Sequence, residues 1–142
     1  MTDYVATRWY RAPELLLGKK KYDKSVDLWA IACIMGELYD TEPLFPGDDE
    51  IQTLYLIQKL LGKLTKKQKE TFFRSQKFPI TSYPELRQKP TGLSKRYKKM
   101  QKSAVSFMKG LLQNDPLKRL TSIEALRHEY FNGMNQEFLQ KP

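Results

Sequence analysis

Cysteine and histidine are nearly missing from the sequence, which has one of each among its 142 residues. A single cysteine, Cys33, excludes an internal disulfide, and its place in an apolar run predicts a buried, reduced thiol. This cysteine usage favours an intracellular location, in the cytoplasm or the nucleus. Because His128 has no organised partner in the sequence, we interpret it as structural and not as a catalytic base.

Long apolar runs are also absent. Asp27 and Glu37 bracket the longest one, so no stretch reaches the length of a membrane span. The N-terminus lacks the apolar core of a signal peptide. The sequence therefore predicts a protein without a membrane partner.

Nucleotide and metal motifs are missing as well. The seven glycines lie too far apart for a GxGxxG loop or a Walker A loop. There is no GxSxG nucleophile elbow and no HExxH zinc motif. Motif spacing thus indicates no cofactor site and no metal site, and composition alone predicts only a helical domain.

Acidic residues are few, with 16 Asp and Glu against 25 Lys and Arg, for a net charge of +9. The lysines cluster in residues 19–21, 63–69 and 95–102. Such clusters can attract nucleic acid, anionic membranes or acidic peptides. No zinc-ligand spacing or RNA-binding aromatic motif accompanies them, so we interpret them as solvated surfaces and regard nucleic acid as an unlikely partner.

The remaining sequence is dominated by helical patterns. Pro13 suits the first turn of a short helix that runs to about Leu17 and is closed by Gly18. Ser25 is a plausible N-cap for a helix over residues 26–39. Apolar residues go nearly all round this helix, which predicts that it is buried on most sides and needs partners on several faces.

Further helical segments follow, separated by one irregular stretch. Three prolines and one glycine predict that residues 75–100 are an extended, irregular insertion. The other expected elements are a helix over 51–61 capped by Asp48 or Asp49 and closed by Gly62, a weaker helix over 66–73, a helix capped by Ser103, and a last helix opened by a capping box at Thr121 to Glu124. The fold class is mainly α.

Four segments resemble the protein kinase family in the order in which kinases carry them. Residues 5–14, Val-Ala-Thr-Arg-Trp-Tyr-Arg-Ala-Pro-Glu, resemble the end of the activation segment of CMGC-group kinases. Asp27-Leu28-Trp29 resembles the Asp-x-Trp of the central helix of the C-lobe. Residues 43–47 resemble the turn after that helix, and residues 115–121 resemble the Asp-Pro-x-x-Arg that ends the domain.

The resemblance implies the C-terminal half of a Ser/Thr kinase domain, the helical C-lobe portion from the activation segment to the last helix. Residues 1–131 would be this partial domain, with an insert at about 75–100, and residues 132–142 a tail. Thr2-Asp3-Tyr4 and residues 54–57 and 62–64 look most like the cyclin-dependent-kinase-like family. Ala32 stands where the family pattern has glycine, and Glu129 stands where it has proline.

By this resemblance, the intact kinase would transfer the γ-phosphoryl group of ATP, with Mg²⁺, to Ser or Thr of protein substrates. The motifs that bind ATP and do the chemistry are not in this chain, which is therefore expected to be inactive alone and to bind neither cofactor. Expected partners are protein substrates, the upstream half of the kinase domain and a possible partner at the 75–100 insert. A free-standing helical protein-binding module derived from a kinase lobe and a basic nucleic-acid-binding domain stay open as alternatives.

The resemblance also assigns roles within the activation segment. Thr2 and Tyr4 match a pair phosphorylated in related kinases, with Arg8 and Arg11 as the arginines that would pair with phosphate. The segment from Val5 to Trp9, with Arg8 turned towards the phosphate, would shape the pocket for the substrate residue after the target Ser or Thr.

Other matched positions have structural roles. Thr7 would make a supporting contact to the absent catalytic loop, and Asp27 would accept backbone N–H bonds from that loop. Glu14 and Arg119 would form a buried ion pair, and Trp29 would belong to the buried central helix.

Overall fold

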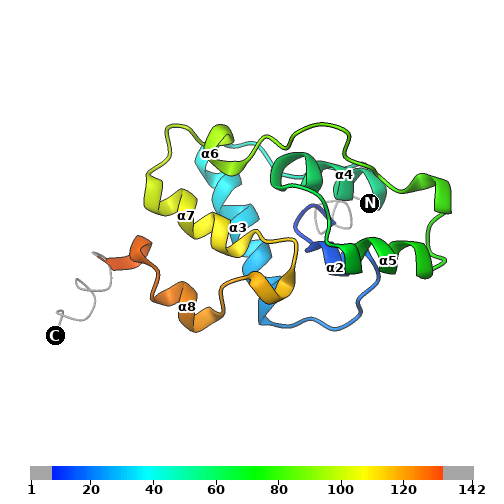
Figure 1. Ribbon diagram of the computed structural model, residues 1–142. Helices are drawn as coiled ribbons and strands as arrows, with labels where there is room; N and C mark the ends of the chain where they lie inside the picture. Colours follow the sequence, from blue (N-terminus) through cyan, green and yellow to red (C-terminus); the bar gives the residue numbers. More distant parts are fainter. Residues whose placement is uncertain (1–7, 133–142) are drawn as a thin grey trace.

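The computed structural model describes residues 8–132, which contain helices joined by irregular segments and no strand (Figure 1). The α-helices are α2 (Pro13–Leu16), α3 (Lys24–Asp40), α4 (Glu50–Leu61), α5 (Lys66–Arg74), α6 (Leu93–Arg96), α7 (Lys102–Leu111) and α8 (Ser122–Leu126). Short 3₁₀ turns are η1 (Ile80–Ser82), η2 (Pro116–Lys118) and η3 (Glu129–Phe131). The mainly α fold class is confirmed.

Helix α3 begins earlier than the sequence pattern indicates. Its N-cap is Asp23, whose carboxylate accepts the backbone N–H of Val26 at 3.1 Å, so the expected cap at Ser25 is wrong. Aspartate and serine cap equally well, and the hydroxyl of Ser25 has a different partner in the interior. The helix ends at Thr41, which adopts the left-handed conformation with φ 61°.

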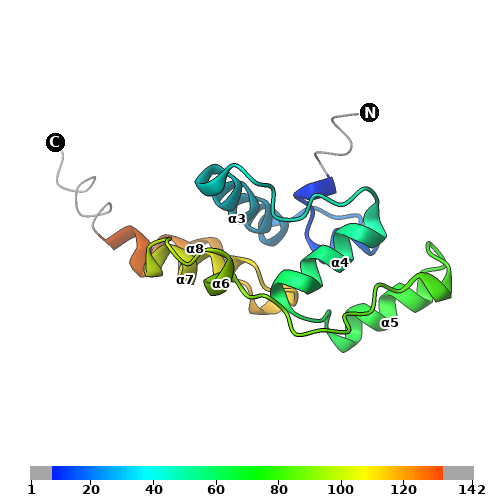
Figure 2. The same cartoon turned by 90° about the horizontal axis from the view of Figure 1, so that it is seen from above.

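One side of α3 forms the centre of the core. Trp29, Cys33 and Gly36 are buried there, and α7 packs along this side (Figures 1 and 2). Trp29 stacks on Phe45 with ring centroids 5.8 Å apart. Burial raises the pKa of the Cys33 thiol, which keeps it protonated and confirms the expected buried cysteine.

The opposite side of α3 lacks cover from residues 8–132. Asp27, Ile31, Ile34 and Leu38 follow one another at intervals of four, three and four residues, and all are exposed. This spacing places them on one helix face. Leu38 is 78% exposed, and the two isoleucines are about half exposed. We call Ile31, Ile34 and Leu38 the apolar stripe; the helix has the apolar character of a fully buried element, but only part of it is buried in this chain.

Helices α4 and α5 begin at side-chain caps. Asp49 accepts the N–H of Gln52 at 2.8 Å, which confirms the expected aspartate cap of α4. Thr65 and Gln68 form a capping box that starts α5, a signal the sequence interpretation missed. Between them, Gly62 closes α4 with φ 114°, a conformation that side-chain-bearing residues rarely adopt.

The expectation that residues 75–100 are an irregular insertion is wrong in part. The segment contains η1 and α6, and the N–H groups of Thr91 and Gly92 bond to the carbonyls of Lys59 and Leu60 at the end of α4. Those carbonyls would otherwise have no partner within the helix. The prolines led to the prediction of an irregular insertion, but the segment packs closely against the neighbouring helices.

Apolar residues of the same segment enter the core. Leu93, Tyr97 and Met100 are buried. Tyr97 fits against Gly36 of α3, where an added Cβ would meet the Tyr97 hydroxyl and would lie 2.6 Å from Cδ1 of Leu44. The lack of a side chain at position 36 therefore allows this segment to approach α3 closely.

Of the two caps predicted for the last helices, one is wrong and one is confirmed. Helix α7 begins after Gln101, which makes no side-chain cap bond, so the expected cap at Ser103 is wrong. The capping box at Thr121 and Glu124 is confirmed, with hydrogen bonds of 2.8 and 3.1 Å.

Candidate functional site

The first described residues are held against the start of α4. The guanidinium of Arg8 donates to the carbonyl oxygens of Gly47 and Asp48 at 3.2 and 2.6 Å. Nε1 of Trp9 donates to the same Gly47 oxygen at 2.9 Å. Arg8 is 5% exposed, so its charge is stabilised by these carbonyls in a largely dehydrated place. The sequence did not predict these two carbonyl acceptors, because every residue has a main-chain oxygen and no residue type marks the ones that Arg8 binds.

Gly47 allows this arrangement because it has no side chain. A Cβ at this position would lie 2.5 Å from the backbone nitrogen of Thr53 and 2.7 Å from its Cα. Gly47→Ala should therefore displace α4 and destabilise the fold by about 1–3 kcal/mol, as overpacking typically does. Urea unfolding measures this loss, and tryptophan fluorescence should report a loosened Trp9.

A neighbouring substitution provides the control. Asp48 is exposed, and Arg8 binds its main-chain oxygen, which an alanine at this position would also provide. Asp48→Ala should change the free energy of unfolding by no more than about 0.5 kcal/mol. Equal stability of Gly47→Ala and Asp48→Ala would contradict the close-approach explanation.

Tyr10 joins the same segment to α3. Its phenol donates a hydrogen bond of 2.6 Å to Oε1 of Glu37. This bond to a carboxylate, with burial as the second cause, raises the pKa of Tyr10 from 10.0 to about 12.

Arg11, a predicted phosphate-pairing residue, is partly buried, and its backbone N–H bonds to the Arg8 carbonyl at 3.2 Å.

The raised pKa of Tyr10 predicts a pH-dependent stability. The folded protein holds the phenol proton more tightly, so this stabilisation is complete below pH 10 and is lost as the pH rises towards about 12. We expect the free energy of unfolding to fall less steeply in this window in Tyr10→Phe than in the unaltered chain. Tyrosinate absorbance, taken as the difference between the two proteins, should show a midpoint near 12. A midpoint near the ordinary value, unchanged by Glu37→Gln, would contradict the assignment.

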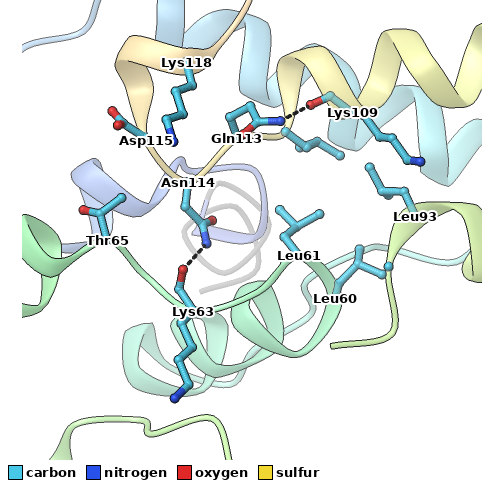
Figure 3. Close-up of a pocket in the computed structure, with 12 residues that line it drawn as sticks. Leu60, Leu61, Lys63, Thr65, Leu93, Lys109, Gln113, Asn114, Asp115 and Lys118 are labelled. Atoms are coloured by element: carbon cyan, nitrogen blue, oxygen red, sulfur yellow. Dashed lines mark hydrogen bonds between the residues drawn. The ribbon is translucent and has the colours of Figure 1, made fainter. Parts of the chain in front are cut away.

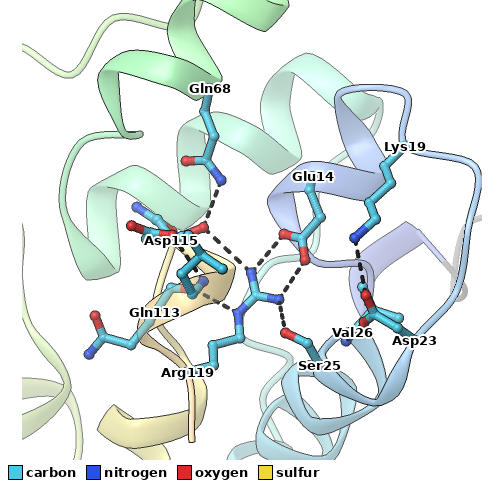
Figure 4. Close-up of polar contacts among 11 residues, drawn as sticks. Glu14, Lys19, Asp23, Ser25, Val26, Gln68, Gln113, Asp115 and Arg119 are labelled. Atoms are coloured by element: carbon cyan, nitrogen blue, oxygen red, sulfur yellow. Dashed lines mark hydrogen bonds and ion pairs between the residues drawn. The ribbon is translucent and has the colours of Figure 1, made fainter. Parts of the chain in front are cut away.

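Glu14 and Arg119 form a buried bidentate ion pair (Figure 4). The two nitrogens of the guanidinium lie 2.6 and 2.7 Å from the two carboxylate oxygens. The Arg119 side chain is 0% exposed and the Glu14 side chain 10% exposed. The pair joins α2 to the loop before α8 across 105 residues of sequence.

The other donors of Arg119 are also used. Nε donates to the carbonyl of Gln113 at 2.8 Å, and a terminal nitrogen donates to the Ser25 hydroxyl at 3.1 Å (Figure 4). The guanidinium lies over the ring of Trp29, 5.0 Å from its centroid. A guanidinium with its hydrogens paired in this way is rigid, so Arg119 fixes α2, α3 and the 113–115 loop together. The contacts from Ser25 and Gln113 were not anticipated from the sequence.

The structure leaves several expected site residues without a described role. Thr2, Tyr4, Val5 and Thr7 lie outside the described residues, so their expected functions are not tested. Asp27 is exposed; its backbone N–H bonds to the Asp23 carbonyl at 3.3 Å, but its carboxylate accepts no hydrogen bond from residues 8–132. Its position in the first turn of α3 is favourable for a carboxylate near a helix N-terminus.

His128 and Ser106 lie in contact, but their geometry does not suit nucleophilic catalysis. Nε2 of His128 is 3.1 Å from the Ser106 hydroxyl, while Nδ1 accepts the backbone N–H of Tyr130 at 3.0 Å. Because Nδ1 is the acceptor, the proton of a neutral imidazole is on Nε2, facing the serine. Nε2 therefore donates to Ser106 and cannot remove its proton, which agrees with a structural role.

Residues 8–132 contain neither a metal-binding cluster nor a membrane-spanning helix. No group of three or more His, Cys, Asp or Glu residues between positions 8 and 132 could hold a metal ion. In the same range, no helix has the length and apolar character that a membrane crossing requires.

Comparison with known proteins decides the family. The family model described as protein kinase domain matches residues 1–131. The chain belongs to the protein kinase family. The all-helical structure of residues 8–132 is the helical C-lobe portion of the kinase fold, and the relatives place the chain with the cyclin-dependent-kinase-like members of the CMGC group.

Three relatives illustrate the likeness. The chain is 44% identical over 142 residues to cyclin-dependent kinase-like 2 of Oryctolagus cuniculus and 44% identical over 140 residues to cyclin-dependent kinase-like 4 of Mus musculus, in each case over 99% of this chain. It is 46% identical over 131 residues, 92% of this chain, to cyclin-dependent kinase-like 5 of Homo sapiens. The chain spans 25%, 41% and 13% of the length of these three proteins, respectively. The similarity therefore shows the family of this chain and not the full activities of the relatives.

Proposed function

We propose that this chain acts within a Ser/Thr protein kinase that transfers the γ-phosphoryl group of ATP to protein substrates. In this proposal, the chain supplies the end of the activation segment, the floor on which the substrate peptide lies and the scaffold beneath it. The kinase match over residues 1–131 supports the proposal most strongly. We propose the same range as the partial domain and residues 132–142 as a tail.

The contacts of Arg8, Trp9 and Glu14 support the role as a peptide-binding floor. Each of the three side chains is bound to an element distant in sequence, with separations of 38 to 105 residues. A binding surface needs such fixed positions, because preorganised groups lose less entropy when the ligand binds. The anchors give the described part of this floor a fixed position.

The described residues do not fit ATP or Mg²⁺. Residues 8–132 offer no carboxylate cluster for a metal, and the sequence has no glycine-rich loop for the phosphates. We therefore derive no catalytic step through either cofactor in this chain. In the proposed kinase, both would be bound by the upstream half of the domain.

The apolar stripe on α3 is the proposed contact surface for that upstream half. Three large apolar side chains in a row are unfavourable in water. Full burial is worth roughly 1.5–3 kcal/mol for an exposed side chain, and about half of that for the half-exposed isoleucines. Asp27 continues the same helix face, where its carboxylate could accept backbone N–H bonds from a covering loop. An alternative, the free-standing binding module, would need a different protein to cover the same face.

The proposed substrate preference is proline directly after the target Ser or Thr. In the proposal, Arg8 holds the backbone of the Val5 to Trp9 segment so that it offers no good hydrogen-bond acceptor to the N–H of the substrate residue after the target Ser or Thr. Proline has no N–H and so loses no hydrogen bond there. In the phosphorylated protein, we propose that Arg8 also helps to fix this segment against phosphate on Tyr4.

A peptide library tests the function and the preference together. The full-length phosphorylated kinase, incubated with Mg-ATP, should phosphorylate Ser and Thr peptides and should prefer proline to alanine at the following position. Arg8→Ala should reduce that preference, while Lys89→Ala, an exposed residue outside the segment, should leave it unchanged. Absence of phosphoryl transfer contradicts the kinase proposal, whereas transfer at equal rates to both peptide classes contradicts only the preference.

A further inference from the structure

A lysine-lined pocket lies where the end of α4, the start of α6, the end of α7 and η2 meet (Figure 3). Its volume is about 380 Å³. Lys63, Lys109 and Lys118 stand on three separate sides of the opening, and each comes from a different part of the chain. Leucine side chains form the apolar part of its wall: Leu60, Leu61, Leu93 and Leu112.

The three lysines have no acidic partner in the described part of the chain. Within residues 8–132, the ion pairs use other cations, and none includes Lys63, Lys109 or Lys118. Asp115 is the one acidic residue that lines this pocket, and its carboxylate accepts the backbone N–H of Leu117 at 3.0 Å. The pocket thus has a surplus of positive charge.

A second pocket continues the positive surface. Its volume is about 420 Å³, and Lys109 lines both pockets. Lys98 and Lys102 also line the second pocket, and no acidic residue does. Five lysines therefore surround two adjoining pockets, which we call the lysine pockets.

The wall of the first pocket is held in place by the rest of the fold. The Asn114 amide donates to the carbonyls of Gly62 and Lys63 at 2.9 and 3.2 Å, and the Asn114 carbonyl accepts from Gln68 at 2.6 Å. Arg119 binds the adjoining Gln113 carbonyl. The pocket is therefore built before any ligand arrives, which lowers the entropic cost of binding.

One polar atom of that wall has no partner. Oδ1 of Asn114 is buried and accepts no hydrogen bond from residues 8–132. Its identity as the oxygen follows from the amide nitrogen, which faces two carbonyls. This oxygen has almost no accessible surface, so it lies inside the wall and does not contact a ligand in the pocket.

We propose that the lysine pockets are a docking site for an acidic peptide segment of a partner protein. Its carboxylate or phosphate groups bind the lysines, and a bulky apolar side chain packs on the leucine wall. The proposal concerns binding alone and does not depend on phosphoryl transfer by the chain.

The pocket chemistry favours a peptide over a nucleic acid. A sugar–phosphate backbone carries negative charge but has no apolar side chain for the leucines. Single-stranded nucleic acids generally bind by stacking bases on aromatic rings. The first pocket has no aromatic residue in its lining, and the one in the second, Tyr97, is buried.

Fluorescence anisotropy with a labelled peptide tests the proposal on the 142-residue chain. The probe is a short peptide with a central leucine flanked by glutamates. The triple variant Lys63→Glu, Lys109→Glu, Lys118→Glu should bind about tenfold more weakly, or worse, because three attractions become repulsions. All three side chains are exposed, so the variant should keep the helical circular dichroism of the unaltered chain.

A charge-matched control separates the site from general attraction. Lys20→Glu, Lys21→Glu, Lys89→Glu changes three exposed lysines that line neither pocket. Each triple variant lowers the net charge from +9 to +3, since every Lys→Glu removes two charges. The control should lose less than about threefold in affinity, as expected for distant screened charges. Equal losses in the two variants would overturn the proposal.

Altered probes test the ligand chemistry. Replacing leucine by serine should weaken binding, replacing glutamate by glutamine should abolish it, and replacing one glutamate by phosphoserine should strengthen it if phosphate is the natural group. Unchanged binding of the glutamine probe would overturn the proposal. Displacement of the glutamate probe by an oligonucleotide far more readily than by unlabelled peptide would do the same, in favour of nucleic acid.

Discussion

Replacing Glu14 by alanine is expected to destabilise the fold by about 3–5 kcal/mol, because the substitution leaves the buried Arg119 charge without its partner. The side chain of Arg119 is 0% exposed, so water cannot take the place of the carboxylate. Urea unfolding followed by tryptophan fluorescence measures this loss. Trp29 lies directly against the guanidinium and should report the local change.

An exposed ion pair in the same chain is the matched control. Lys19 and Asp23 lie 3.1 Å apart, with side chains 39% and 48% exposed. Lys19→Ala should cost at most about 1 kcal/mol, the usual worth of a surface pair. The double variant Glu14→Leu, Arg119→Met should be more stable than Glu14→Ala, since it leaves no stranded charge. If Glu14→Ala is as stable as Lys19→Ala, the buried pair does not hold α2 in the way described.

A charge in the apolar stripe should have opposite effects in the isolated chain and in the intact kinase. Leu38→Glu in the isolated chain removes an exposed apolar side chain, so it should reduce association and the binding of dyes that fluoresce on apolar surfaces. In the intact kinase, the same position would be covered, and the substitution should destabilise it by about 2–5 kcal/mol or more. Thermal unfolding and dye fluorescence of both proteins measure the two effects.

Leu117 provides the comparison for this test. It is 92% exposed and lies in η2, away from α3 in sequence and outside the stripe. Leu117→Glu should leave the stability of both proteins within about 0.5 kcal/mol. A stabilising or neutral effect of Leu38→Glu in the intact kinase would mean that the stripe is not covered there.

The sequence alone located the longer helices but only some of their caps. Apolar periodicity located α3, α4 and α7, and the capping box at Thr121 was correct in both of its bonds. The errors at Ser25 and Ser103 have one cause. Several polar residues near each helix start suit the N-cap, and only the packed structure decides which side chain is free to turn back to the helix.

The long-range contacts of the site could not be derived from residue patterns. Nothing local to Glu14 or Arg119 indicates that they meet, because they lie 105 residues apart; that expectation depended on family resemblance. The acceptors of Arg8 are main-chain oxygens at Gly47 and Asp48, which any residue type would provide. Proline content gave the wrong impression of residues 75–100, since prolines interrupt helices without preventing burial.

The contact between Gly36 and Tyr97 limits how the connection between α5 and α7 can be redesigned. Excising that connection would remove Tyr97 and uncover the bare backbone of α3 at a point with no side chain of its own. The result would be an internal groove, which lowers stability in proportion to its volume. A shorter connection should be tolerated only when it supplies another large side chain in place of Tyr97, because a Cβ at position 36 would still lie 2.6 Å from Cδ1 of Leu44.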